Sequence, residues 1–260
     1  MSIVSTPPQT DQPRPHRAPL LEVVVLHPRD VPGADEGGAD RVLLLADPEL
    51  GGTSPEPALV SSVCRETELP VRVVLRLSSS STTTGAELVR LVGLAESYRS
   101  VGAEGVAFGF LDDQLEVDVE VCAHLAGQLP GLPWTFHRVF DDALETARAW
   151  REVSRLPGLD AVLTAGSVLG LDSGLDDLTA RAAASPGVAA LVMASGGLRG
   201  EHVPWLVRAG IRQFQVATSV RPGGSWQKAY VDAGHVRSWR MLVDDAVAHV
   251  ERLEAGRSAG

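Results

Sequence analysis

The sequence predicts a single α/β domain folded as a closed barrel of eight parallel strands with helices outside it, a (β/α)8 TIM barrel. Strand-like apolar runs alternate with helical patterns from residue 20 onward in the 260-residue chain, and eight units in about 240 residues fit that fold. A glycine, which readily takes the left-handed conformation of a helix end, precedes several runs: Gly38, Gly102, Gly158 and Gly210. An open doubly wound sheet is the alternative, but its usual glycine-rich turn is absent after the first run.

Eight runs have the composition of buried strands. The first, residues 20–26, is apolar except for Glu22, as expected for a strand covered on both faces. The fifth begins at Trp134 and runs through His137 to Asp141, where a helical pattern opens. The other expected strands, rich in strand-favouring side chains, span 41–45, 71–77, 105–110, 161–164, 188–193 and 213–217.

Helical patterns separate these runs. The first is short or irregular, because Pro28, Pro32 and Gly33 interrupt it. Asp141 stands where a helix N-cap belongs. Residues 78–84, all Ser or Thr, form a polar loop before the third helix. The expected longer helices span 57–66, 86–101, 117–129, 141–155, 175–184, 200–208 and 232–253.

Composition restricts the partners. The net charge of −10 disfavours nucleic acid and anionic membranes as partners. Residues 1–19 contain five prolines and few apolar side chains, which predicts a disordered tail before a barrel spanning 20–260. The tail has no apolar core of a signal peptide, and no run is long enough to span a bilayer, so we expect a cytoplasmic protein. Cys64 and Cys122 are expected to be free thiols.

Functional groups of such a barrel lie where the strands end, at the C-terminal mouth. His137 is a candidate acid or base, with a hydrogen-bonded histidine inside the barrel as the alternative. Arg76 is a candidate anion-binding group, with an ion pair to Glu22 or Asp118 as the alternative. Further candidates for ligand binding at the mouth are Arg138, which could instead cap the fifth helix with Asp141, and Asp118, Thr164, Gln215 and Thr218.

The loops after the seventh and eighth strands form a phosphate site in many barrels. Gly196 and Gly197 follow the seventh strand, and Thr218 follows the eighth, so a small anionic or phosphorylated ligand is a candidate. No metal site is predicted, because Cys64 and Cys122 fall on helices outside the barrel and Met193 belongs to the core. No cofactor is evident.

Several stretches resemble the CutC copper-homeostasis family. The most specific is TFHRVFD at 135–141; the others are LEV at 21–23, GGADR at 37–41, GGTSP at 51–55, VLR at 74–76, GAEGVAFG at 102–109, EVD at 116–118 and LTAG at 163–166. The resemblance runs from about residue 20 to about residue 220 in consistent order. It implies a (β/α)8 barrel, a cytoplasmic location, a homodimer and a link to copper(I), without an established enzyme activity.

The chain departs from the pattern of the family it resembles. Val24, Leu43 and Leu45 stand where the family has Cys, Glu and Cys, and those cysteines are the proposed copper(I) ligands. Gln215 replaces a histidine, and the family's Arg-Pro-Arg becomes Arg-Leu-Ser from Arg76 on. Alternation places the three apolar replacements inside the barrel with Glu22 and Arg41, so copper binding by the family's thiols is not expected.

Three functions remain open at this point. The first is a non-catalytic barrel of copper homeostasis that binds a small ligand or a partner at its mouth. The second is an enzyme acting on a small anionic or phosphorylated carbon compound, in which Arg76 holds the anion and His137 moves a proton. The third is a barrel that has lost an ancestral activity. An open pocket shared by His137 and Arg76 would favour the enzyme, and a mouth filled by side chains would favour the third function.

Overall fold

The computed structural model describes residues 18–258. Its strands pair in parallel in chain order and β1 closes on β8, which confirms the expected (β/α)8 barrel. Most of the expected disordered tail, residues 1–17, lies outside the described residues. The strands are β1 (Leu20–Val25), β2 (Arg41–Leu44), β3 (Val71–Val74), β4 (Gly105–Phe108), β5 (Trp134–Phe136), β6 (Leu159–Thr164), β7 (Val192–Ala194) and β8 (Gln213–Val216).

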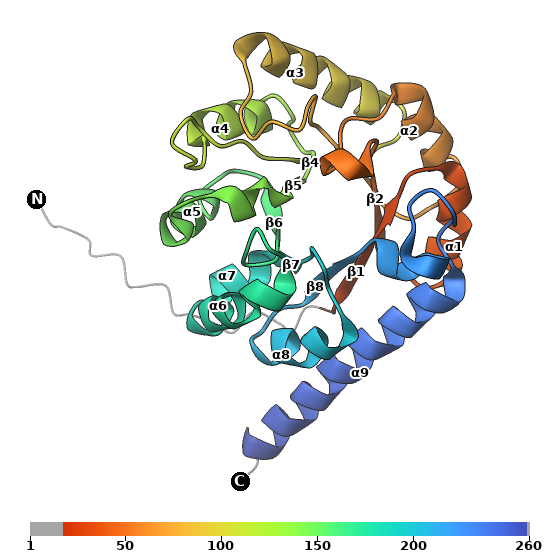
Figure 1. Cartoon of the computed structure of the whole chain (residues 1–260), viewed down its shortest axis with the longest axis vertical. Coiled ribbons are helices and arrows are strands. Elements are labelled where there is room, and N and C mark those ends of the chain that lie inside the picture. Colours follow the sequence, from red (N-terminus) through yellow and green to blue (C-terminus); the bar gives the residue numbers. More distant parts are fainter. Residues whose placement is uncertain (1–17, 259–260) are drawn as a thin grey trace, which may run out of the picture.

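The helices form a ring outside the strands, and the long α9 (Ala233–Ser258) lies against α1 (Val31–Glu36) and α8 (Val203–Arg208) (Figure 1). No helix within residues 18–258 is long and apolar enough to cross a membrane. The other α-helices are α2 (Pro57–Cys64), α3 (Gly85–Ser100), α4 (Val119–Gly127), α5 (Thr146–Val153), α6 (Leu171–Ala184) and α7 (Pro186–Leu191). Short 3-10 helices are η1 (Pro28–Asp30), η2 (Pro48–Leu50), η3 (Arg138–Asp142), η4 (Gly200–His202), η5 (Thr218–Val220) and η6 (Pro222–Gly224).

The fifth helix and the seventh strand both begin later than expected. Asp141 does not cap a helix: it lies within η3, and α5 begins only at Thr146. The Asp141 carboxylate instead accepts hydrogen bonds from the end of β6, a side-chain bond that competes with helix formation. The seventh strand does not begin at residue 188, because Ser185 caps α7 by accepting from the Val188 N–H at 3.4 Å and Pro186 occupies its first turn.

The barrel lumen is charged toward the N-terminal strand ends and apolar toward the mouth. Glu22 and Arg41 form a buried ion pair of 2.5 Å on β1 and β2, and the Gln215 amide donates to Glu22 at 2.7 Å. Arg72 on β3 bonds Asp160 and Thr135. The next lumen positions carry a buried apolar cluster, as alternation predicts: Val24, Leu43, Leu45, Val74, Ala107, Ala161, Leu163 and Met193.

Gly105 makes room for one of these lumen charges. A Cβ atom at Gly105 would lie 3.0 Å from Nε of Arg72 and 2.9 Å from the Pro133 carbonyl oxygen. A side chain at position 105 would press on both groups, and of the two the Arg72 side chain is the more easily displaced. The glycine therefore keeps the Arg72 guanidinium on Asp160.

A buried ion pair also fixes the segment after β8. Arg221 binds both carboxylate oxygens of Asp30, at 2.9 and 2.7 Å, and both side chains are about fully buried. Asp30 also accepts the N–H groups of Leu26 and Val231, at 2.8 and 3.0 Å. The pair thus ties the end of β1 to the long connection before α9.

We expect Asp30→Ala to lower the free energy of unfolding by about 3–5 kcal/mol, because Arg221 would remain buried without a counter-charge. That loss corresponds to a fall in Tm of roughly 10 °C in a thermal unfolding scan. The control Asp244→Ala removes an exposed ion pair with Arg240 and should change stability by less than about 1 kcal/mol. Equal losses in the two variants would contradict the anchoring role of Asp30.

Candidate functional site

His137 lies directly after β5 with both ring nitrogens bonded to backbone. Its Nδ1 accepts from the Val139 N–H at 3.2 Å, so in the neutral ring Nε2 carries the proton and donates to the Gly51 carbonyl at 3.3 Å. The ring is 6% exposed. Burial, together with the nearby Arg76 charge, lowers the pKa of His137 to about 4. The geometry is that of the hydrogen-bonded alternative, a neutral histidine without a free nitrogen.

Arg76 approaches His137 but does not share an open pocket with it. The Arg76 guanidinium donates to the carbonyl oxygens of Ser79 at 2.6 Å, Ser80 at 3.3 Å and Leu50 at 3.2 Å. The expected ion pair with Glu22 or Asp118 is wrong, because Glu22 binds Arg41 and Asp118 caps α4 at Val121 N–H.

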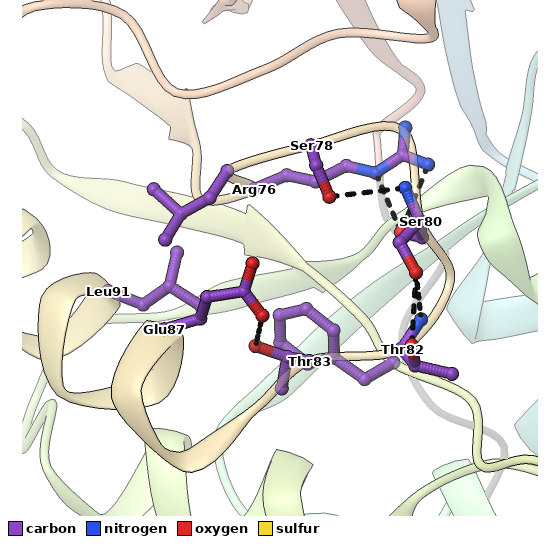
Figure 2. Close-up of a pocket in the computed structure, with 9 residues that line it drawn as sticks. Arg76, Ser78, Ser80, Thr82, Thr83, Glu87 and Leu91 are labelled. Atoms are coloured by element: carbon purple, nitrogen blue, oxygen red, sulfur yellow. Dashed lines mark hydrogen bonds between the residues drawn. The ribbon is translucent and has the colours of Figure 1, made fainter.

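Figure 2 shows Arg76 beneath the Ser/Thr loop that follows β3. The hollow beside it has a volume of about 10 Å³, which is room for about one water molecule. Thr83 and Glu87 line this hollow and bond each other at 3.5 Å. The hollow therefore offers no space for a small-molecule substrate.

Arg138 and Asp141 join neighbouring strand ends. Arg138 pairs with the Asp141 carboxylate at 3.0 Å, and the same carboxylate accepts from the Thr164 hydroxyl and, at 2.9 Å, from the Ala165 N–H. Burial raises the pKa of Asp141, while these bonds and Arg138 act in the opposite direction. The expected capping role is wrong, because α5 begins only at Thr146, and the pair instead links η3 to the end of β6.

Gly196, in the loop after β7, lies directly against the guanidinium of Arg138. A Cβ atom at Gly196 would lie 2.1 Å from Nη1 of Arg138, and Gly196 has φ of +77°, so only glycine fits. The Gly196 carbonyl accepts from the Leu171 N–H at 2.9 Å, which ties this loop to α6. Gly197 follows with φ of +83°.

The remaining candidates do not gather around one ligand position. Asp118 caps α4, and Gln215 lies inside the barrel on Glu22. Thr218 begins η5, and its carbonyl accepts from the Arg221 N–H at 3.0 Å. The structure thus places the sequence-derived candidates near the strand ends but divides them among separate loop contacts.

Trp226, which is not among the site residues predicted from the sequence, packs on the apolar lumen cluster at the mouth. The indole lies against the lumen cluster together with Leu26 and Ala217. The Arg221 guanidinium lies 5.2 Å from the indole centroid, and the neighbouring Gln227 donates to Glu49 at 3.1 Å. An aromatic residue in the glycine-rich connection after β8 was the available sequence signal.

One group in the described residues has the composition of a metal site, namely Asp172, Glu201 and His202. Arg199 already bridges both carboxylates, at 2.7 and 2.5 Å. His202 accepts the Arg199 N–H at Nδ1, so its neutral Nε2 is protonated and faces Asp172 at 2.9 Å. A metal would have to displace the arginine and reverse the tautomer, so the group fits an ion-pair network better than a metal.

Neither cysteine is a ready thiolate. Cys122, inside α4, donates toward the Phe110 carbonyl at 3.9 Å, and burial raises its pKa to about 12. Burial also raises the pKa of Cys64 at the end of α2. Both lie on the outer helices, as expected from the sequence.

Exposed apolar side chains, in contrast, recur on the loops at the C-terminal face. Leu144 follows β5 with 70% of its surface exposed, and its N–H donates to the Leu115 carbonyl at 3.1 Å. Leu115 itself has φ of +57°, a conformation that costs a branched residue about 1–2 kcal/mol. We call the exposed set after β2, β4, β5 and β6 the loop patch: Leu50, Leu115, Leu144, Val168 and Leu169.

The comparisons with known proteins agree on one family. A model of the CutC family matches residues 19–220. A CutC family protein of Klebsiella pneumoniae is 29% identical over 181 residues, which are 69% of this chain and 72% of the relative. The human copper homeostasis protein cutC homolog is 32% identical over 151 residues, 56% of this chain and 54% of the relative.

Solved structures share the fold. CutC from Streptococcus agalactiae superposes with a TM-score of 0.68 at 20% identity, covering 76% of this chain and 97% of the other. Thiamine phosphate pyrophosphorylase from Pyrococcus furiosus reaches 0.54 at 19% identity, covering 88% and 96%. These identities establish the barrel alone, but the family model spans most of the sequence. The chain therefore belongs to the CutC copper homeostasis family.

Proposed function

We propose that this protein serves copper homeostasis as a non-catalytic barrel that binds a protein partner through its C-terminal face. The observation that carries the proposal is the mouth itself, where Trp226 packs on the apolar lumen side chains and the hollow beside Arg76 has a volume of only about 10 Å³. The loop patch supplies the apolar surface that a partner would cover.

The enzyme alternative loses support at His137. A general acid or base needs a nitrogen within reach of the substrate proton, and both nitrogens of this ring are bonded to backbone. His137 therefore has no free nitrogen at the mouth, and its bond to Gly51 instead links the loops after β2 and β5. A barrel that has lost an ancestral activity is compatible with the proposed role, because partner binding does not require the old chemistry.

Copper(I) is not expected to bind through thiolates. The positions where the family resemblance places the ligands hold Val24, Leu43 and Leu45, all in the lumen cluster. The raised pKa values of Cys64 and Cys122 keep both thiols protonated near neutral pH. The proposed role therefore concerns a partner rather than a bound copper ion.

In a titration against a chromophoric copper(I) chelator, we expect the protein to withdraw no copper(I). The double variant Cys64→Ser, Cys122→Ser should behave identically. As a gain-of-function comparison, Val24→Cys with Leu45→Cys restores thiols on neighbouring strands and should increase copper(I) retention. Copper withdrawal that the Cys64/Cys122 variant abolishes would refute this assignment.

The neutral state of His137 predicts a pH dependence of stability. Its pKa is about 4 in the folded protein and ordinarily 6.5, so between those values the unfolded chain binds a proton that the folded protein does not. The free energy of unfolding therefore falls as pH drops from about 7 to about 4. His137→Asn keeps an acceptor and a donor without titrating, and should lose about 3 kcal/mol less than wild type over this range.

Urea unfolding at several pH values measures this difference. His235→Asn, which alters an exposed histidine on α9, is the matched control and should follow wild type. Parallel pH profiles for wild type and His137→Asn would mean that His137 is not held neutral by burial.

The partner role predicts which surface matters in cells. In a strain lacking its own copy of this gene, Leu144→Glu with Leu169→Glu should fail to restore the copper tolerance that wild type restores, because both charges fall on the loop patch. Val89→Glu with Leu253→Glu alters exposed positions on α3 and α9 and should restore it fully. Both variants should keep the wild-type Tm within about 2 °C, since surface changes cost little. Loss of function in the helix variant alone would place the partner elsewhere.

A further inference from the structure

The Ser/Thr loop 78–84 wraps the guanidinium of Arg76, which lies at the end of β3. The Ser79 and Ser80 carbonyls and the Leu50 carbonyl accept its hydrogen bonds. No carboxylate of residues 18–258 lies within ion-pair distance of it, although the chain has a net charge of −10. Arg76 is thus a half-buried cation whose hydrogen bonds all go to neutral oxygens. Burial lowers its pKa, and the more distant Asp142 carboxylate acts in the opposite direction.

An anion in direct contact with Arg76 would supply a closer counter-charge than Asp142 does. Guanidinium groups bind phosphate oxygens through paired N–H donors, and such charge-assisted bonds are about twice as strong as neutral ones. The hollow beside Arg76 is too small for a phosphorylated metabolite. A phosphoryl group attached to the loop itself would need no such cavity.

The hydroxyl groups of the loop are not equivalent (Figure 2). Ser78 accepts from the Ser80 N–H at 3.3 Å, and Ser80 bonds Thr82 at 3.0 Å. Thr83 and Thr84 both bond Glu87, whose carboxylate would repel a phosphate. Ser81, whose carbonyl accepts from the Leu111 N–H at 2.8 Å, is only half-exposed. Ser79 is exposed, and its hydroxyl, like that of Ser81, has no hydrogen-bond partner among the described residues; Ser79 is the one of the two beside Arg76. Its own carbonyl is 2.6 Å from Nη2 of Arg76.

We propose that Ser79 is a phosphorylation site, with Arg76 as the group that binds the resulting phosphate. The Ser79 hydroxyl oxygen attacks the γ-phosphorus of ATP, held by a Ser/Thr protein kinase. The bond from that phosphorus to the bridging oxygen breaks, ADP leaves, and the hydroxyl proton passes to a base of the kinase. The phosphate adds about −1.5 to −2 charges at neutral pH beside Arg76.

The modification would act on the face proposed to bind a partner. Arg76 also donates to the carbonyl of Leu50, which belongs to the loop patch. A phosphate that engages Arg76 competes for this donor and places negative charge beside an apolar contact. This effect on partner binding rests on the proposed function, whereas the modification site itself does not.

The first test is mass spectrometry of the full chain purified from its native cells, grown with and without added copper, under phosphatase inhibition. Trypsin cleaves after Arg76 and Arg90, so one peptide, 77–90, carries every hydroxyl of the loop. We expect one phosphoryl group on this peptide, located on Ser79 and absent in Ser79→Ala. An unmodified peptide, or phosphate confined to any Ser or Thr of the loop other than Ser79, overturns the proposal.

The second test isolates the contact with Arg76. Phosphoserine installed at position 79 during translation is titrated by phosphorus NMR. Its second pKa should be lower by about 0.5 pH unit or more with Arg76 present than in Arg76→Gln, because a cation favours the dianion. Arg65→Gln, which removes an exposed arginine bonded to Ser61 on α2, is the charge-matched control and should change nothing. Equal values with and without Arg76 overturn the pairing, and neither result depends on the copper-tolerance experiment.

Discussion

A barrel of eight strands closed on itself leaves a lumen that side chains must fill, and this constraint shapes the rest of the structure. Here Glu22, Arg41 and Arg72 point into the lumen from β1, β2 and β3, and the next lumen residue of each strand toward the mouth is apolar. Glu22 and Arg41 neutralise each other, and Gln215 completes the bonding of Glu22. The charged lumen residues therefore lie toward the N-terminal end of the barrel, which is the end that contributes stability. The apolar lumen residues lie toward the mouth.

The polar groups that remain at the mouth bind the backbone of their own loops. His137 bonds Gly51 and Val139, and Arg76 bonds Leu50 and the Ser/Thr loop. Such bonds satisfy buried donors and acceptors, so they stabilise the loops but leave few groups to meet a substrate. The same residue types at the same strand ends can thus serve either chemistry or loop architecture, and their bonding partners decide between the two.

The sequence was sufficient for the barrel because alternation and helix-ending glycines are local signals. Gly38, Gly102, Gly158 and Gly210 all have positive φ, as expected. It was insufficient for Asp141, whose bonds to Thr164 and Ala165 join residues 23 and 24 positions apart in the chain. The same holds for the ion pair of Arg221 with Asp30, separated by 191 residues. Local pattern thus identified the candidate residues, while only the packed structure could identify their partners.

Closure of the mouth and exposure of the loop patch have a common origin in the loops after the strands. Once the lumen is filled, these loops need not admit a substrate, and their tips are free to carry apolar side chains. Leu115 keeps a left-handed conformation and remains 37% exposed, although glycine, which has no Cβ atom, would relieve that strain. Strain at an exposed apolar position does not stabilise the isolated chain, and it is consistent with the proposed use of this surface for binding. In the proposed role, the filled lumen and the exposed loop patch are two parts of one arrangement, in which the mouth admits no substrate and its loops present apolar side chains to a partner.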